Sequence, residues 1–354
     1  MKLKKKTAAK ILYLLPLILL AIFIFLVIFD RSGTGGKSPL NELLFGYEVE
    51  GFVYYPISHR NYFFIVISIV LLMTLLLVIV LNISKKKSNL ISIINSELSN
   101  KNKTIVSSIN YGLMIQNKII PSKSIADKVF ENNFVIFYPK DIVSGDIYQF
   151  FKIKDTSYVV SIDCTGHGVP GAFLTIIATN SLYKILDNSQ INSPKELLTK
   201  LSLEFIKSVS ISESQNYNDS MAVSICSYCN NSKQLLFAGV NSKVMLIKNN
   251  TTLMLNGSKN DIFNLNETNS ETFFTEQVFD LQKNDSFYLF SDGFHDQFGG
   301  LKNKKMGLNK LKTLLENNSK YLVSDQEINL KNEFSHWKGD DEQTDDVTLI
   351  GIKI

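Results

Sequence analysis

The stretch YVVSIDCTGHGVPGAF, residues 158–173, joins an apolar strand pattern to an acidic residue and a glycine-rich loop. Its first part is rich in β-branched and aromatic residues, which favours an extended strand. Asp163 stands where this strand meets the loop, and Gly-His-Gly separates it from a predicted helix at residues 169–186. A buried carboxylate is costly unless it is paired or binds a metal ion. The stretch therefore predicts one side of a polar or metal-binding site.

Three further strand ends carry acids. Asp146 follows Val-Ser-Gly just before a strand, Asp292 lies in Ser-Asp-Gly after another, and Asp345 and Asp346 precede the last strand. Each motif alone is weak, since Asp-Gly after a strand is usually a turn. An acidic cluster with no His or Cys counterpart prefers Mg²⁺ or Mn²⁺ to zinc. Two such ions roughly 3.5–4 Å apart can activate a water molecule for in-line attack on a phosphoryl group.

The pattern around these acids predicts many strands with the helices collected in pairs. This arrangement is typical of an α+β fold in which two packed sheets have helices outside. Ser193 and Pro194 have the residue types of a helix N-cap and first helical position. The predicted strands are residues 134–138, 147–154, 157–164, 221–228, 234–240, 244–249, 273–281, 286–291 and 347–354, and the predicted helices are 169–186, 193–209, 308–317 and 325–337.

The order of the motifs is far more specific than any one of them. Val-Ser-Gly-Asp, Asp-x-x-Gly-His-Gly-Val-Pro-Gly-Ala-Phe, Ser-Asp-Gly and Asp-Asp-x-Thr together resemble the SpoIIE/RsbU-like branch of the metal-dependent (PPM-type, type 2C-like) serine/threonine phosphatases. The resemblance covers residues 121–354. It implies an α-β-β-α sandwich phosphatase domain, a metal site at one edge of the two central sheets and two ions, Mn²⁺ or Mg²⁺.

The resemblance also implies roles for five residues. Asp146 matches the first metal-binding acid, and Asp163 matches the acid that bridges both ions. Cys164 stands where many members have a glycine that binds metal through its backbone carbonyl, a role that another residue can also fill. Asp292 and Asp345 match the remaining metal-binding acids. No side-chain nucleophile is implied.

Other positions stay open. Asp346 is a less certain ligand than its neighbour. The type 2C enzymes often bind the substrate phosphate with an arginine, and there is none after Arg60. Lys140 is therefore either a phosphate contact or a surface charge, and His167 is either a general acid or a loop histidine that caps the next helix. Residues 218–222 depart from the Asp-Gly-Met-Asp of close relatives, so no role is carried over there.

The three cysteines predict reduced, structural thiols. Cys226 and Cys229 are three apart on a predicted strand and so point to opposite faces, which makes a shared metal ion awkward. An odd count without a repeating framework argues against a disulfide-stapled secreted domain.

The first eighty residues predict a two-helix membrane anchor. Residues 11–29 and 62–82 are uncharged apolar runs long enough to cross a bilayer, and lysines precede the first and follow the second. The positive-inside rule then places both ends in the cytoplasm, with the catalytic domain on that side of the cell membrane. A cleaved signal peptide is the alternative for the first run. Residues 30–61 form a short extracytoplasmic loop, too small for an ordinary sensor domain.

Residues 83–120 predict a helical connector that ends before Pro121. Apolar residues recur mostly three or four apart, which gives a narrow apolar stripe. Two interpretations are equally favoured: a stalk that pairs with a second copy, giving a homodimer, and a helix packed on its own catalytic domain.

The full organisation is a cytoplasmic N-terminus (1–10), two spans (11–29 and 62–82) around a loop (30–61), a connector (83–120) and a phosphatase domain (121–354). The favoured function is hydrolysis of phosphoserine or phosphothreonine on a cytoplasmic regulatory protein, and the resemblance suggests a partner of the anti-sigma-factor-antagonist type. One alternative is a catalytically silent membrane module that binds a phospho-regulator. Another is a hydrolase for a small phosphorylated metabolite. A net charge of +4 does not favour nucleic acid as a partner.

Overall fold

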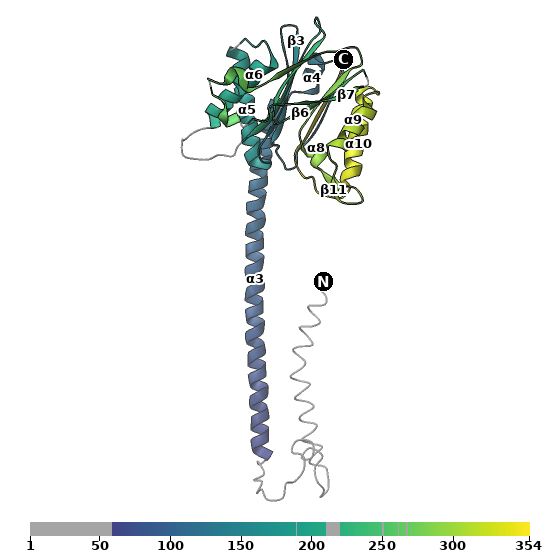
Figure 1. Ribbon diagram of the computed structural model, residues 1–354. Helices are drawn as coiled ribbons and strands as arrows, with labels where there is room; N and C mark the ends of the chain where they lie inside the picture. Colours follow the sequence, from purple (N-terminus) through teal and green to yellow (C-terminus); the bar gives the residue numbers. More distant parts are fainter. Residues whose placement is uncertain (1–58, 189, 210–219, 250, 261, 267) are drawn as a thin grey trace, which may run out of the picture. The chain divides into compact units, whose positions relative to one another are not determined.

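The structure is a computed structural model that describes residues 59–188, 190–209, 220–249, 251–260, 262–266 and 268–354 (Figure 1). The predicted first span (11–29), the N-terminus (1–10) and almost all of the predicted loop (30–61) lie outside these residues. The chain divides into two compact units, Met1–Asn102 and Lys103–Ile354.

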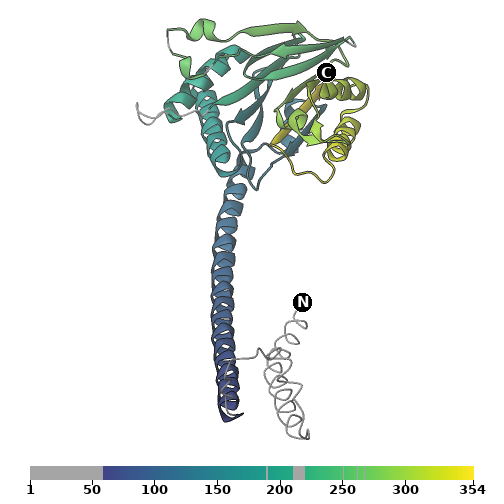
Figure 2. The ribbon, with the colours of Figure 1, turned by 60° about the horizontal axis from the view of Figure 1, so that its bottom comes forward.

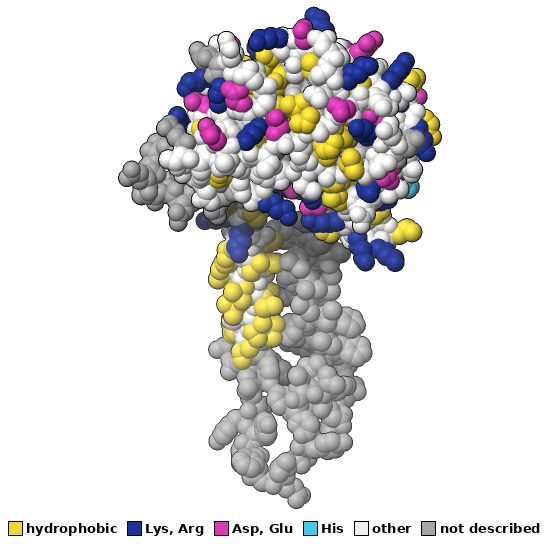
Figure 3. Space-filling view, turned by 45° about the horizontal axis from the view of Figure 1, so that its top comes forward, with side chains coloured by type: hydrophobic (Ala, Val, Ile, Leu, Met, Phe, Trp, Pro, Cys, Tyr) yellow, Lys and Arg dark blue, Asp and Glu magenta, His cyan; other side chains and the backbone are white. Residues whose placement is uncertain are grey.

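The first unit contributes most of one long helix, α3 (His59–Ile119). No proline interrupts it, and it ends just before Pro121, as predicted. The segment that begins at Phe64 is long and apolar enough to cross a membrane, and its most apolar stretch is not buried against protein. Hydrophobic side chains cover this segment in Figure 3. Helix α5 (Gly168–Asn188) meets the same criterion although it is half buried, so length and composition alone do not assign a span.

The second unit contains two five-stranded antiparallel sheets. Sheet A has the order β1 (Asn133–Tyr138), β12 (Val347–Lys353), β9 (Ser286–Phe290), β6 (Lys243–Lys248) and β7 (Thr251–Asn256). Sheet B has the order β2 (Asp146–Ile153), β3 (Thr156–Cys164), β4 (Met221–Cys229), β5 (Gln234–Val240) and β8 (Glu276–Asp280).

Three apolar clusters define the layers of this unit. The central cluster lies between the sheets and includes Phe237 from sheet B and Phe287 from sheet A. A second cluster packs α5 and α6 (Pro194–Val209) on sheet B, and a third packs α9 (Leu308–Asn318) and α10 (Val323–Lys338) on sheet A (Figures 1 and 2). The predicted α-β-β-α sandwich is therefore confirmed.

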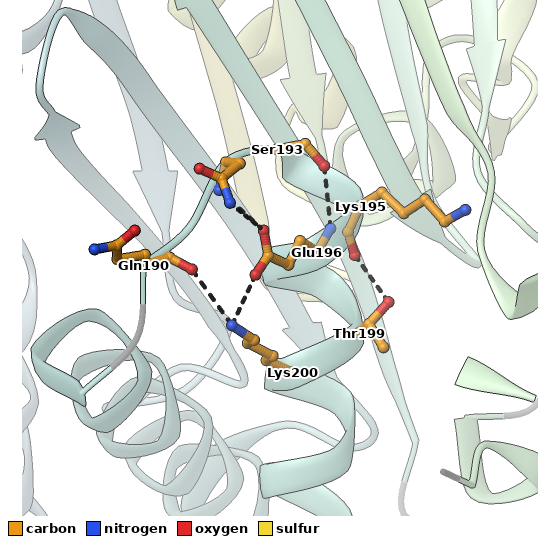
Figure 4. Close-up of polar contacts among 7 residues, drawn as sticks. Gln190, Ser193, Lys195, Glu196, Thr199 and Lys200 are labelled. Carbon is orange, nitrogen blue, oxygen red and sulfur yellow. Dashed lines mark hydrogen bonds and ion pairs between the residues drawn. The ribbon is translucent and has the colours of Figure 1, made fainter. Parts of the chain in front are cut away.

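Helix α6 begins as its sequence predicts. The backbone N–H of Glu196 donates to Ser193 Oγ, which makes Ser193 the N-cap (Figure 4). The Glu196 carboxylate accepts hydrogen bonds from the Asn192 backbone N–H and from Lys200 Nζ. The bond to Ser193 satisfies a backbone donor that the first turn of a helix leaves free, and the Glu196 carboxylate holds the residue before the N-cap in place.

A few elements differ from the sequence prediction. The strand expected at residues 273–281 begins only at Glu276, because Ser270–Phe273 forms a short helix, α7. The edge strand β7 was not predicted, since its apolar residues, Leu253–Leu255, are consecutive and give no strand alternation. Five further short elements were also missed: α4 (Lys123–Val129), the 3-10 helix η1 (Ile262–Asn264), α8 (Gly293–Asp296), and β10 (Phe298–Gly299) and β11 (Lys304–Lys305), which form a hairpin.

Candidate metal centre

The register of sheet B brings two of the predicted acids together. Strands β2 and β3 form an antiparallel hairpin in which Asp146 is directly opposite Asp163. Side chains opposite each other in such a pair lie about 4.5–5.5 Å apart at their Cβ atoms. Asp146 is buried and Asp163 is partly buried. The two acids paired at the open end of this hairpin therefore create a concentrated negative charge.

The edge of sheet A supplies the other acids. Strands β9 and β12 are antiparallel neighbours, with Phe290 opposite Leu349. Asp292 follows the end of β9 and Asp345 precedes the start of β12, so both lie at the same edge of the sheet. Asp292 is exposed and Asp345 is partly buried, which makes this side of the site the more accessible one.

Two hydroxyl groups join the sheets at this point. Ser291 Oγ donates to Asp146 Oδ2 over 2.6 Å, and Thr348 Oγ1 donates to the same oxygen over 2.7 Å. Asp146 belongs to sheet B, whereas the two donors flank the acids of sheet A. Sequence reasoning gave no role to Ser291 or Thr348, although they are the Ser of Ser-Asp-Gly and the Thr of Asp-Asp-x-Thr.

Asp346 holds the loop that leads into β2. Its Oδ1 accepts the backbone N–H of Lys140 over 2.8 Å, and its Oδ2 accepts that of Gly145 over 2.7 Å. Both carboxylate oxygens are thus engaged with backbone. A Cβ atom at Gly145 would lie 2.4 Å from the carbonyl oxygen of Gly166, so the two loops approach too closely for any other residue. The Lys140 side chain remains only a predicted phosphate contact.

The carboxylates act on one another electrostatically. Burial, and then the negative charges of Asp346 and Asp292, raise the pKa of Asp146 to about 7, although the hydrogen bonds from Ser291 and Thr348 oppose the shift. Burial raises the pKa of Asp163 well above its usual value, and the charges of Asp146, Asp292, Asp345 and Asp346 add to the effect. All five carboxylates therefore belong to one electrostatic cluster.

The donor set fits a hard divalent cation. It consists of carboxylate oxygens, and a divalent cation offsets the mutual repulsion that adds to the effect of burial on their pKa values. Within the described part of the chain, no three Asp, Glu, His or Cys side chains are already grouped so that they could hold one ion. Asp146, Asp163, Asp292 and Asp345 therefore stay predicted ligands that the fold brings to neighbouring strand ends.

Cys164 is the last residue of β3, and its side chain packs in the apolar cluster between sheet B and helices α5 and α6. The thiol therefore faces the core, and any ligand from this residue would be its backbone carbonyl. Its N–H donates to the Gly145 carbonyl over 3.0 Å, which ties β3 to the loop before β2. None of Cys164, Cys226 and Cys229 is in a disulfide bond.

His167 forms a pair that the sequence did not reveal. Its Nδ1 lies 2.7 Å from Asp141 Oδ2, and both side chains are about half exposed. Asp141 lies in the loop between β1 and β2, and His167 precedes the first residue of α5, so the contact joins the two loops beside the acids. A general-acid role for His167 remains a prediction.

A family model described as Stage II sporulation protein E (SpoIIE) matches residues 154–354, which is more than half of the chain. The chain belongs to the SpoIIE family. It is therefore a homologue of the PP2C-type (PPM) serine/threonine phosphatases, which are hydrolases. A comparison with curated protein sequences found no significant match.

A solved phosphatase domain has the same fold. The chain resembles the SiaA-PP2C domain of Pseudomonas aeruginosa with 23% identity and a TM-score of 0.64, over 72% of this chain and 98% of that domain. It also matches the PP2C phosphatase domain of SpoIIE from Bacillus subtilis, solved with a fragment of its regulatory domain, with 18% identity and a TM-score of 0.48 over 63% of each chain. At this level of identity, the first likeness confirms the fold.

Proposed function

We propose that the protein is a membrane-anchored, metal-dependent phosphatase that removes phosphate from a serine or threonine of a cytoplasmic regulatory protein. The observation that carries the proposal is the convergence of acids from both sheets, with Asp146 of sheet B held by the hydroxyls of Ser291 and Thr348 beside sheet A. A fold stabilised only by its core gains nothing from crowding five carboxylates at one edge.

The residues divide the work of the proposed site. Asp146, Asp163, Asp292, Asp345 and the Cys164 carbonyl would hold two Mn²⁺ or Mg²⁺ ions. Such ions, when bound, make a water molecule nucleophilic and neutralise charge on the transferred phosphoryl group. Ser291 and Thr348 fix the orientation of Asp146, as outer partners of metal ligands do in other proteins. The accessible acids Asp292 and Asp345 give the substrate phosphate its approach.

The proposed membrane attachment and the proposed partner are supported mainly by features of the sequence. The apolar, unburied segment of α3 from Phe64 onward and the lysines that follow it support a span with the phosphatase domain in the cytoplasm. Ile94, Leu98 and Ile105 are exposed along α3, which supports pairing with the same helix of a second copy. Membership of the SpoIIE family supports a regulatory phosphoprotein as the substrate, of the anti-sigma-factor-antagonist type.

The test is phosphate release by the full chain in detergent micelles. The substrates are a phosphoserine peptide, a phosphothreonine peptide and p-nitrophenyl phosphate, each with Mn²⁺, with Mg²⁺ and with chelator. Asp163→Asn removes a proposed ligand, and Asp155→Asn is its matched control, because Asp155 is exposed in the turn at the opposite end of the same hairpin.

We expect metal-dependent release from both peptides, lost in Asp163→Asn and kept in Asp155→Asn. A folded protein that releases no phosphate with either metal would favour the silent binding module instead. Turnover of the small ester without turnover of either peptide would favour a metabolite hydrolase.

A further inference from the structure

One residue of helix α3 stands apart from the rest. Among the α3 side chains that the structure describes, residues 64–119, Gln116 is the only buried one, at 1% exposure. A helix that merely packs on a domain buries apolar side chains. Here the buried side chain is a polar amide, which is favourable only if its hydrogen bonds are made.

Both ends of that amide bind the main chain of one residue. Gln116 Nε2 donates to the Ser144 carbonyl over 2.7 Å, and Gln116 Oε1 accepts the Ser144 N–H over 3.0 Å. Nε2 is also 3.1 Å from Thr175 Oγ1 of helix α5. Ser144 and Thr175 are fully buried, so water does not compete for these bonds.

Ser144 lies two residues before the predicted ligand Asp146 and is bonded to it. Ser144 Oγ accepts the Asp146 backbone N–H over 3.1 Å, and the intervening Gly145 is held by Asp346 and by the N–H of Cys164. Gln116 therefore fixes the main chain from which Asp146 projects.

We infer that Gln116 is a positioning residue of the metal centre: its amide clamps the main chain of Ser144 and so sets the place of Asp146. The inference rests on the proposed function. It makes the last turns of α3 part of the metal site, and it predicts that a phosphatase domain cut after this helix, such as residues 121–354, binds metal weakly.

Gln149 provides a matched comparison. It is also a buried glutamine, and its Nε2 donates to the Ile119 carbonyl at the end of α3 over 2.7 Å, while its Oε1 accepts from Tyr183. Gln149 thus tethers the same helix end but does not contact Ser144. Loss of the Gln149 hydrogen bonds frees only the end of α3, whereas loss of the Gln116 hydrogen bonds also frees the loop at Ser144.

The experiment measures Mn²⁺ binding to the full chain in detergent micelles, by electron paramagnetic resonance of the free ion, and so does not depend on turnover. Gln116→Met removes both hydrogen bonds to Ser144. Gln116→Asn keeps a polar amide that is one methylene too short, and it carries the test if the first variant does not fold. Gln149→Met is the control, and melting temperatures are recorded for every variant.

We expect both Gln116 variants to bind Mn²⁺ about ten-fold more weakly, in the range seen for outer partners of metal ligands, and Gln149→Met to stay within about two-fold of the wild type. Wild-type affinity in the Gln116 variants, or an equal loss in Gln149→Met, would overturn the inference. A wild type that binds no Mn²⁺ would overturn the proposed function and this inference together. A wild type that binds Mn²⁺ but releases no phosphate would overturn the proposed function alone, and the affinities would still decide the role of Gln116.

Discussion

The two sheet edges that form the candidate centre differ in how they hold their acids. On sheet B, Asp146 and Asp163 face each other across a hairpin, and Asp146 is buried and hydrogen-bonded. On sheet A, Asp292 and Asp345 lie in loops beside the strands, and Asp292 is exposed. We call the edge of sheet B with Asp146 and Asp163 the preset side, because its carboxylates are crowded there at a cost in stability. The edge of sheet A with Asp292 and Asp345 is the open side, which substrate can reach.

The largest expected effect comes from removing one acid on each side. Asp163→Asn and Asp292→Asn should each lower phosphate release by more than about 100-fold, since even outer partners of metal ligands contribute about 10- to 100-fold. Both substitutions should raise the melting temperature of the metal-free protein, and Asp163→Asn should raise it more, because burial raises the pKa of Asp163 well above its usual value and that of Asp292 to a lesser extent. Differential scanning calorimetry measures the melting temperatures, and phosphate-release assays on the same proteins measure the activity. Equal stabilisation by the two substitutions would contradict the distinction between the sides.

The next effect is a pH dependence of the metal-free protein. The pKa of Asp146 is about 7 in the folded state and near 3.8 when unperturbed, so the folded state binds a proton that the unfolded state has released. The free energy of unfolding should therefore be highest below about pH 4, fall as the pH rises, and level off above about pH 7. Melting temperatures between these limits measure the fall, and Asp146→Asn should reduce it without abolishing it, because burial also raises the pKa of Asp163. A stability that increases over this range in wild type, with no change in the variant, would count against the assignment.

A smaller effect is expected from the hydroxyls that join the sheets. Ser291→Ala and Thr348→Val each remove one hydrogen bond to Asp146 Oδ2. Each should weaken Mn²⁺ binding about ten-fold. Ser157→Ala is a control, because Ser157 is also buried on sheet B but donates to the Val129 carbonyl, away from the acids. Unchanged Mn²⁺ affinity in both hydroxyl variants would show that Asp146 does not need this support.

The smallest effect is expected from substitutions in the exposed pair of His167 and Asp141. His167 and Asp141 are about half exposed, so their pair should contribute less than about 1 kcal/mol to stability. Asp141→Asn should leave the melting temperature almost unchanged. If His167 acts only as a loop residue, His167→Gln should also keep phosphate release near the wild-type value. A large fall in release for His167→Gln at unchanged metal affinity would instead support the general-acid role.

The acids could be predicted from the sequence because they lie at the ends of strands. Asp163 and Asp146 were found because each lies where a strand pattern meets a loop, and a short turn made the hairpin that pairs them foreseeable. The order of the four motifs was enough to predict the sandwich. The predicted segment boundaries mostly agree with the structure to within two residues at the strands that carry the acids.

The supporting contacts could not be predicted, because they depend on how distant segments pack. Ser291 and Thr348 reach Asp146 only when the two sheets stack, and their partners are 145 and 202 residues away in the sequence. Gln116 is a polar residue in a helical pattern and is typical of a surface position, and only the packing of the loop at Ser144 shows that it is buried. A single sequence shows which acidic residues lie at strand ends, but it does not show the hydrogen bonds that form between the layers of the fold.

Titration of the full chain with Mn²⁺, with bound metal and phosphate release from a phosphoserine peptide measured in the same samples, decides whether the clustered acids hold a catalytic metal. We expect release to rise with occupancy, chelator to abolish it, and Asp163→Asn to lose both binding and release. Release that persists in chelator, or in Asp163→Asn without bound Mn²⁺, would rule out a metal-dependent reaction at these acids.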